Sequence, residues 1–301
     1  MNLSITGNCQ ARPLSQLFEQ VGTIKKVNTF ILHLSDEGSI NEDKKILDQS
    51  DLIIAQKTNK NFKPDHLNSH WLKKNYKDKV LIWPNIFFMG QQPFIRYITS
   101  SSGRLKGPLD DYHDIRILLD WLKAKEIIYK NINFMPTYVE DSCQFGLDSL
   151  KVKENGCDVI ISDLVKKYNH KELLFYSFNH PSSFLLMRLF DRLLLKARGM
   201  FEDKAELKLQ DISFKKEEPL ATYIMPSNWP DHFENDSFRG LNLSTLSNKK
   251  FINYSLNELE HAFFKFYDMN LLDKVDLKTI RFTPSIENDS DIILCIKNIK
   301  N

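Results

Sequence analysis

A cysteine close to the start of the chain could supply a nucleophile. Cys9 lies in the stretch ITGNCQARPLSQLF, between an apolar strand-like run and a segment whose apolar residues have helical spacing. Backbone N–H groups and the dipole at a helix start favour negative charge, and Arg12 adds positive charge. These effects predict a lowered thiol pKa and a reactive thiolate. The alternative, which this stretch alone favours, is a packed cysteine acting as a small apolar residue.

A histidine in a similar setting could act as a general base. His180 in FYSFNHPSS lies between a buried strand-like run and a helical segment that opens at Pro181. A helix N-terminus disfavours imidazolium, so we expect a neutral ring near pH 7, able to accept a proton. The alternative is a polar cap of the helix backbone. Cys9 and His180 would form a nucleophile–base pair if their strands are neighbours in one sheet, which the sequence leaves open.

Other polar residues could complete a site. His113 in DDYHDIR opens a predicted helix and is either a catalytic residue or part of a solvated helix face. His66 and His70 are four residues apart, but they lack a third ligand, so no metal site is predicted. The residues assigned to cofactor binding are Asn8, Gln10, Arg12, Asn85, Gly90, Arg104, Lys106 and Asn179.

The side-chain chemistry gives a reason for two groups among these residues. Asn8 and Gln10, with backbone N–H groups beside Cys9, would stabilise an oxyanion, and one such donor typically contributes about 3 kcal/mol. Arg104 and Lys106 lie in the glycine-containing stretch SSSGRLKGP, where phosphates could bind. Solvated surface charge is the alternative for both.

An α/β fold would position these residues. Short apolar β-runs alternate with helical segments, which is typical of a parallel sheet covered by helices on both faces. Ligands bind beyond the carboxyl ends of such strands, where the order along the chain places Cys9, Gln56, Asn85 and Gly90. We predict a Rossmann-like core over residues 1–200 and a mainly helical C-terminal appendage over residues 201–301. The predicted strands span 2–6, 24–32, 51–56, 79–86 and 173–178.

The composition excludes several classes of protein. The chain has 301 residues, of which 42% are apolar and 27% charged, and its formal net charge is +2. This balance gives no indication of binding to nucleic acid or to an acidic membrane surface. No apolar run approaches the roughly 20 residues of a membrane span, and no secretory signal is visible. Four cysteines without CxxC spacing fit a reducing compartment, so we expect a cytoplasmic protein; the oligomeric state is not indicated.

Several motifs in a fixed order resemble one family. GNCQARPL, DLIIAQ, WPNIFFMG, DYHDIRIL, CDVIISDLV and FNHPSSFLLMRL together resemble the WcbI-type polysaccharide biosynthesis family, proposed acetyltransferases of bacterial capsule assembly. The resemblance covers roughly residues 3–198. It implies binding of coenzyme A or acetyl-CoA and O-acetyl transfer to a sugar hydroxyl. It also implies that Cys9 and His180 work together, and His113 matches a further family position.

A looser likeness connects the chain to SGNH hydrolases and their acetyltransferase relatives. Cys9 in GNC stands where those proteins have the serine of GDS, and His180–Pro181 matches their HP. Ser177 stands where the orienting aspartate would be, which puts a full triad in doubt. A backbone carbonyl or Asn179 would then have to orient the histidine.

The leading hypothesis is therefore an acyl-CoA-dependent O-acyltransferase that acts on a saccharide. Cys9 would either carry the acyl group or shape the site while His180 activates the hydroxyl. One alternative is an esterase or thioesterase that uses the same pair with water. Another is a non-catalytic saccharide- or nucleotide-binding module in which the cysteine is only packed.

Overall fold

The chain folds into two compact units. A computed structural model describes residues 1–101, 103–128, 134, 137–199, 212–215, 220, 238–241, 251–271, 277–284 and 289. The first unit comprises Met1–Phe88, Leu147–Phe175 and Asn179–Ala221; the second comprises Met89–Gly146, Tyr176–Phe178 and Thr222–Asn301. The interior segment Met89–Gly146 thus groups with Thr222–Asn301 in the second unit. The boundary at residue 200 between a catalytic core and an appendage stays a prediction.

A four-stranded parallel sheet forms the centre of the first unit. Its strand order is β2-β1-β3-β4, and every neighbouring pair is parallel. All residues of β3 are buried, as expected when helices cover both faces of a parallel sheet. The predicted parallel α/β core is confirmed. The strands are β1 (Asn2–Gly7), β2 (Lys26–Ile31), β3 (Leu52–Gln56) and β4 (Val80–Trp83).

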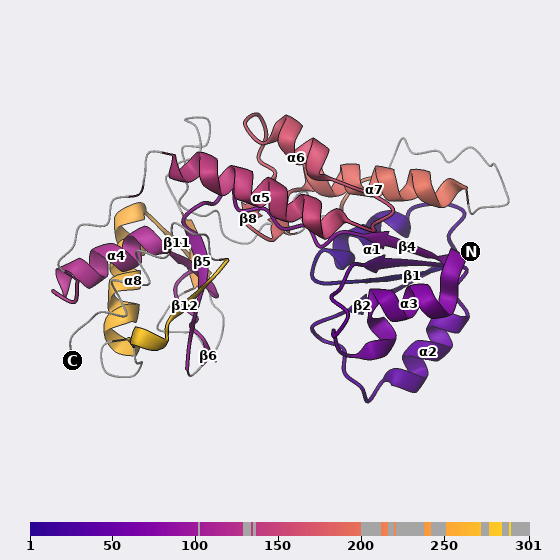
Figure 1. Ribbon diagram of the computed structural model, residues 1–301, viewed down its shortest axis with the longest axis horizontal. Coiled ribbons are helices and arrows are strands. Elements are labelled where there is room, and N and C mark those ends of the chain that lie inside the picture. The colour runs from indigo at the N-terminus through magenta and orange to yellow at the C-terminus, as the bar shows by residue number, and fades with distance from the viewer. Residues whose placement is uncertain are drawn as a thin grey trace. The chain divides into compact units, whose positions relative to one another are not determined.

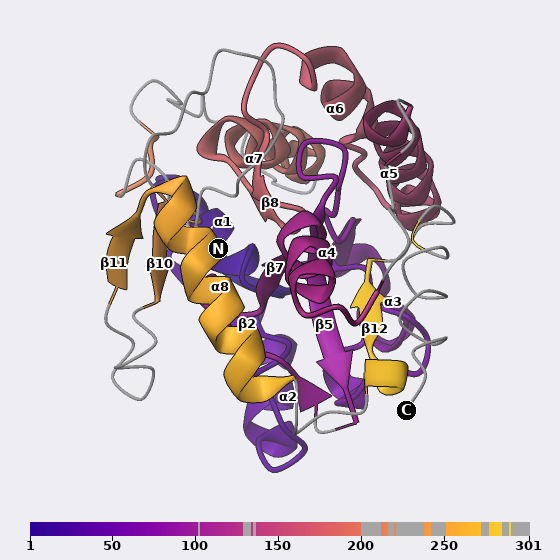
Figure 2. The same ribbon diagram turned by 90° about the vertical axis from the view of Figure 1, so that its left-hand side faces the viewer.

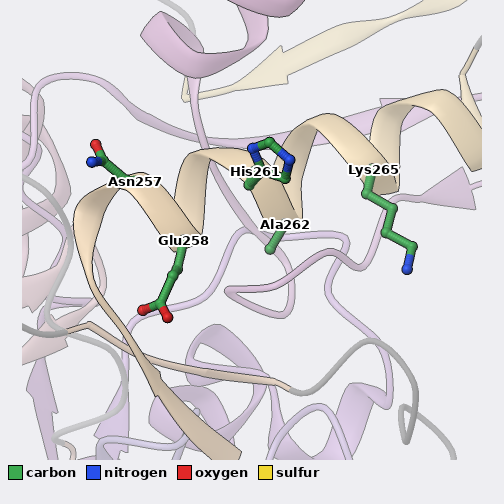
Figure 3. A pocket seen from close by; sticks show the side chains of 5 residues that line it. All are labelled: Asn257, Glu258, His261, Ala262 and Lys265. Atoms are coloured by element: carbon green, nitrogen blue, oxygen red, sulfur yellow. The ribbon is translucent and has the colours of Figure 1, made fainter.

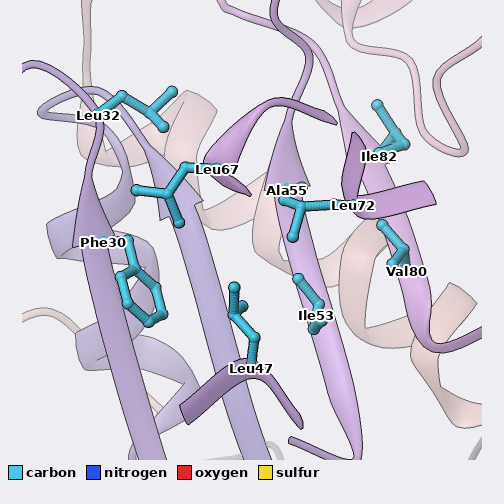
Figure 4. Packing of buried hydrophobic residues seen from close by; sticks show 9 residues of the cluster. All are labelled: Phe30, Leu32, Leu47, Ile53, Ala55, Leu67, Leu72, Val80 and Ile82. Carbon is cyan, nitrogen blue, oxygen red and sulfur yellow. The ribbon is translucent and has the colours of Figure 1, made fainter. Parts of the chain in front are cut away.

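Two pairs of helices sandwich this sheet. Figure 1 shows α2 (Ile40–Asp48) and α3 (Ser69–Tyr76) on one side and α1 (Ala11–Phe18) and α7 (Ser183–Arg198) on the other. Alternate strand residues point to opposite faces, so one face meets α2, α3 and the short helix η1 (Asp65–Leu67). Figure 4 shows the apolar cluster there, formed by Phe30, Leu32, Leu47, Ile53, Ala55, Leu67, Leu72, Val80 and Ile82.

The α1–α7 side of the sheet is held by a direct helix–helix contact. The rings of Phe18 and Phe190 pack edge to face, with centroids 4.8 Å apart. Both side chains are almost fully buried. This contact fixes the helix that follows Cys9 against the helix that follows His180.

A short hairpin precedes α7 and contains His180. Strands β8 (Phe175–Ser177) and β9 (His180–Pro181) form a separate two-stranded sheet. The predicted strand over residues 173–178 therefore exists, but it is not a neighbour of β1 in the parallel sheet. The backbone N–H of Ser182 donates to the carbonyl of Leu174 over 2.8 Å and closes the hairpin. Helix α7 begins only after that bond, so His180 is not its N-cap residue.

Two further helices and a short 3₁₀ turn belong to the described residues around this sheet. Helix α5 (Tyr138–Glu154) begins in the second unit and ends in the first, and α6 (Ser162–Tyr168) follows it. The turn η2 (Lys77–Lys79) leads into β4. None of the helices in the described part of the chain is long and apolar enough to cross a membrane.

The second unit is built on an antiparallel sheet. Strand β5 (Ile95–Ser100) pairs with β6 (Gly103–Arg104), β7 (Tyr112–Asp114) and β12 (Arg281–Thr283). Residues 281–283, far from β5 in sequence, are therefore part of this sheet. Figure 2 shows α4 (Ile115–Ala124) and α8 (Leu256–Asn270), which contact each other. The remaining elements are β10 (Phe238–Leu241), β11 (Phe251–Tyr254) and η4 (Leu277–Thr279).

A buried ion pair also ties the C-terminal residues to β5. The Arg96 guanidinium donates to both carboxylate oxygens of Asp289, over 2.9 and 3.2 Å, and to the Tyr138 hydroxyl over 2.8 Å. The Tyr138 hydroxyl donates to the same carboxylate over 2.9 Å. Arg96 and Asp289 are fully buried. Each charge therefore depends on the other, since neither can be solvated by water.

Candidate active site

The turn that carries Cys9 begins at a glycine that no other residue could replace without movement. A Cβ atom on Gly7 would lie 2.7 Å from Cζ2 of Trp83 and 3.1 Å from the Cβ of Ala11. Trp83 is the last residue of β4 and is fully buried. Glycine is needed at this position because the indole ring lies against the backbone.

Polar side chains meet at the carboxyl ends of three parallel strands. The backbone N–H of Asn8 donates to Oε1 of Gln56 over 2.9 Å, and its Nδ2 donates to Oδ1 of Asn85 over 3.2 Å. Oδ1 of Asn8 accepts the backbone N–H of Gln10 over 3.0 Å. These bonds join the ends of β1 and β3 to the loop after β4. They satisfy backbone and amide groups where the Cys9 turn leaves the sheet.

Gln10 is the central residue of this amide cluster. Its side chain is fully buried, and Nε2 donates to the carbonyls of Ile86 and Asn179 over 2.7 and 2.9 Å. Its Oε1 accepts Nε2 of Gln56 over 3.1 Å. An amide nitrogen has two hydrogens, and both are used here. The side chain of Gln10 is therefore not available as the oxyanion donor or cofactor ligand that the sequence suggested.

Cys9 is half-buried, and the pKa of its thiol is shifted in the direction opposite to the prediction. Burial raises the pKa of Cys9, and this effect outweighs the backbone N–H groups of Cys9 and Gln10 and the charge of Arg12, which lower it. The prediction of a lowered pKa is wrong. Burial of the thiol explains the difference, and the exposed Arg12 side chain opposes it only weakly because water screens its charge. The resting group is the neutral thiol.

His180 has the predicted neutral ring, for a different reason. Burial lowers the pKa of His180 to about 4. Since α7 begins at Ser183, the helix terminus is not the cause. A neutral imidazole can accept a proton from a nearby hydroxyl or thiol.

The Gln10 side chain connects the segment that contains Cys9 to the segment that contains His180. Gln10 immediately follows Cys9, and Asn179 immediately precedes His180. The 2.9 Å bond from the Gln10 amide to the Asn179 carbonyl therefore joins the two segments next to the residues of interest. The sequence suggested that neighbouring strands would bring them together; a side-chain amide makes the connection instead.

His113 is buried in the second unit, on β7 and not on a helix. Its Nδ1 lies 3.0 Å from the hydroxyl of Tyr267 and its Nε2 lies 3.2 Å from the carbonyl of Leu105. The ring packs beside Phe263 and Phe266 and is fully buried. Burial lowers the pKa of His113 to about 4. These contacts support a structural role in the core of that unit, in contrast to a solvated helix face.

The other predicted ligand residues of the second unit have protein partners. Arg104 lies over the ring of Tyr97, 4.0 Å from its centroid, and pairs with Asp111 over 3.0 Å. Lys106 lies 3.6 Å from Asp110 and 3.7 Å from Asp111. Gly90 is buried. The charges of both cations are thus partly balanced by carboxylates.

The described residues contain no cluster of metal ligands, and the second unit has a pocket along α8. Within the residues that the structure describes, no group of three or more His, Cys, Asp or Glu side chains could hold a metal ion. Figure 3 shows a pocket along α8 of the second unit, where Glu258 also caps the helix start through Ser255. Its lining residues are Asn257, Glu258, His261, Ala262 and Lys265.

Comparison with known proteins identifies the family. The model of the family described as polysaccharide biosynthesis enzyme WcbI matches residues 2–200, which is well over half of the chain. The chain belongs to the WcbI family. The match includes the Cys9 turn and the His180 hairpin and confirms the resemblance drawn from the motifs.

A solved WcbI structure has the same fold. It aligns with a TM-score of 0.67 and 19% sequence identity, covering 89% of this chain and 90% of the other. That protein is described as a novel polysaccharide biosynthesis enzyme, in its native form without a disulfide bond between coenzyme A and a cysteine. At this identity the likeness establishes the fold alone. No curated protein matches the sequence significantly.

Proposed function

We propose that this WcbI-family protein is an acyl-CoA-dependent O-acetyltransferase that acts on a saccharide hydroxyl in capsule or surface polysaccharide biosynthesis. The observation that carries the proposal is the hydrogen bond between Gln10 and Asn179, because it joins a thiol-bearing segment to an imidazole-bearing one. Membership of a polysaccharide biosynthesis family supports the substrate class. The related structure, which is described with coenzyme A and a cysteine, supports an acyl thioester as donor.

The protonation states favour a general-base reaction. Burial raises the pKa of Cys9 and lowers the pKa of His180, so the resting pair is a neutral thiol and a neutral imidazole. In the direct route, His180 takes the proton of the sugar hydroxyl as its oxygen attacks the acetyl carbonyl. The C–S bond of the thioester then breaks, and the CoA thiolate takes the proton from His180. Cys9 shapes the site in this route.

The covalent route uses the same groups in two steps. His180 removes the Cys9 proton, the sulfur attacks the acetyl carbonyl, and protonated CoA thiol leaves. The sugar hydroxyl then attacks the Cys9 thioester while His180 takes its proton, and the free thiol is restored. The first proton transfer is uphill, because it creates a thiolate and an imidazolium in a buried setting that disfavours both charges.

Transfer assays with matched variants test the proposal. Purified protein is incubated with acetyl-CoA, with and without saccharide acceptors, and free CoA and acetylated sugar are measured. We expect sugar-dependent release, loss of transfer in His180→Ala, and wild-type transfer in the control Cys157→Ala. Full activity in His180→Ala would contradict both routes, and full activity in Cys9→Ala would contradict only the covalent one.

The alternatives predict other results in the same experiment. Release of CoA that does not depend on sugar would indicate a thioesterase or esterase. The raised pKa of Cys9 predicts slow alkylation by iodoacetamide at pH 7 that accelerates above pH 9. Protection of Cys9 by CoA, with no effect on Cys157, would show that the thiol lies at the CoA site and would argue against a module in which the cysteine is only packed.

A further inference from the structure

The side-chain amide of Gln10 is hydrogen-bonded at both its nitrogen and its oxygen. Its nitrogen and oxygen together make four contacts of hydrogen-bond length, of which two are to backbone groups of Ile86, one is to the Asn179 carbonyl and one is to Gln56. A fully buried side chain that satisfies every donor and acceptor has one preferred orientation, because any rotation leaves a buried polar atom without a partner.

Gln56 fixes which way this amide points. Its Nε2 donates to Oε1 of Gln10 over 3.1 Å, so the oxygen of Gln10 faces Gln56 and its nitrogen faces Asn179. The other end of the Gln56 amide accepts the backbone N–H of Asn8 over 2.9 Å. The two glutamines therefore form a chain of hydrogen bonds from the backbone beside Cys9 to the backbone beside His180.

We infer that Gln10 is a positioning residue, which holds the His180 peptide against the Cys9 turn, and that Gln56 keeps the Gln10 amide in the orientation this requires. The role of Gln10 in catalysis rests on the proposed function, whereas the chain of hydrogen bonds is independent of that function.

The hairpin that carries His180 is short enough to need such an anchor. Strand β9 has only two residues, and α7 starts after it. The Ser182–Leu174 bond holds the hairpin on its far side, and the Gln10 bond holds it immediately before His180. Loss of the second anchor would let the imidazole move and become hydrated. A displacement of about 1 Å in a reacting group can lower a rate by about 10²-fold.

The pKa of His180 provides a readout that does not need catalysis. Burial keeps this pKa at about 4, well below the ordinary value of 6.5, so a ring that gains water should titrate at higher pH. Imidazole NMR signals can be followed in the full chain, and His180→Asn identifies the signal by its loss. We expect Gln10→Leu to raise the pKa of His180 by at least one unit, and Gln56→Leu to raise it by a smaller amount.

The same variants give the kinetic test. Gln10→Leu should lower kcat of the transferase about 10²-fold while changing KM for acetyl-CoA less than 3-fold, since the thioester contacts are not altered. Gln92→Leu is the control, because it removes a buried glutamine of the second unit. If Gln10→Leu does not fold, Gln56→Leu carries both measurements, since it removes one bond of the Gln10 amide and leaves the others.

The outcomes separate this inference from the proposed function. Unchanged His180 pKa and kcat in folded Gln10→Leu would overturn the positioning role while leaving transferase activity in place. A raised His180 pKa in Gln10→Leu, together with no acetyl transfer by the wild-type protein, would support the anchor and refute the transferase proposal. Equal loss of activity in Gln10→Leu and Gln92→Leu, with no change in the pKa, would reduce the effect to general destabilisation and overturn the inference.

Discussion

Replacing Gly7 by alanine should destabilise the first unit and damage the site together. The new Cβ would lie 2.7 Å from Cζ2 and 3.3 Å from Cη2 of Trp83, whereas non-bonded carbons prefer about 3.5–4.0 Å. The indole is fully buried, so it cannot move into solvent. Overpacking of a core usually costs about 1–3 kcal/mol, and a rigid ring at this distance places Gly7→Ala near 3 kcal/mol. Relief of the clash would shift the turn that contains Cys9.

Gly22→Ala is the matched control for this prediction. Gly22 lies after α1, where an added Cβ would meet no atom within 4 Å and the backbone is not in the left-handed region. Alanine there should raise stability by about 0.4–1 kcal/mol, because it restricts the unfolded chain. The free energies of unfolding are measured by urea denaturation, comparing midpoints at constant slope. If Gly7→Ala were as stable as Gly22→Ala, Trp83 could not lie against Gly7 and the derivation of the turn geometry would be refuted.

Two further predictions concern buried ionisable side chains. Asp289→Ala leaves the Arg96 guanidinium buried without its carboxylate and should lower the free energy of unfolding by about 3–5 kcal/mol. In the control Asp148→Ala, loss of the exposed pair with Lys151 should cost less than about 1 kcal/mol. Similar losses in the two variants would contradict the burial of the Arg96–Asp289 pair. Burial lowers the pKa of both His113 and His180 to about 4. Below pH 6.5 the unfolded chain therefore binds protons that the folded chain does not. The contribution of these histidines to stability should be constant above pH 6.5 and should fall between pH 6.5 and 4. Each histidine should account for about 2 kcal/mol at pH 5, and a denaturation midpoint that does not change between pH 7 and pH 5 would show that both rings are hydrated.

The parallel core was predictable because the sequence patterns that specify its strands and helices are local. Each strand of the sheet is a short apolar run between helical segments, and three of the four strand ends carry a polar residue that takes part in the site. Gln56 illustrates the limit of this approach. Its place at a strand end was visible, but its bonds to Asn8 and Gln10 depend on the register of β1 and β3.

The second unit could not be divided from the first by local pattern. Strand β12 pairs with β5, and Thr283 lies opposite Tyr97 although the two are far apart in sequence. Such antiparallel pairing leaves no mark in the composition of either segment. The apolar run that contains Phe175 likewise reads as a buried strand, but an apolar run does not specify the sheet it joins.

Errors in the electrostatic predictions have the same origin. The motif around Cys9 displays Arg12 and a helix start, which lower a thiol pKa, but it does not display the burial that raises it. His113 was placed on a helix face with solvent as the alternative. It lies instead on β7, and its partner Tyr267 is 154 residues away in sequence. Desolvation is contributed by residues distant in the chain, so local charge patterns overstate the ionised form of a buried group.

Burial acts in the same direction on both members of the Cys9–His180 pair, since it disfavours thiolate and imidazolium alike. The neutral pair is therefore the stable resting state, and ionisation of Cys9 has to be coupled to ligand binding or to a step in which charge is not fully separated. If the protein is the acetyltransferase proposed above, attack by a sugar hydroxyl with concerted proton transfer to His180 meets that requirement without a free thiolate. Under that proposal the two pKa shifts favour direct transfer over an acyl-cysteine intermediate. Both routes would need the imidazole at a fixed place relative to the Cys9 turn, which is the role we propose for Gln10.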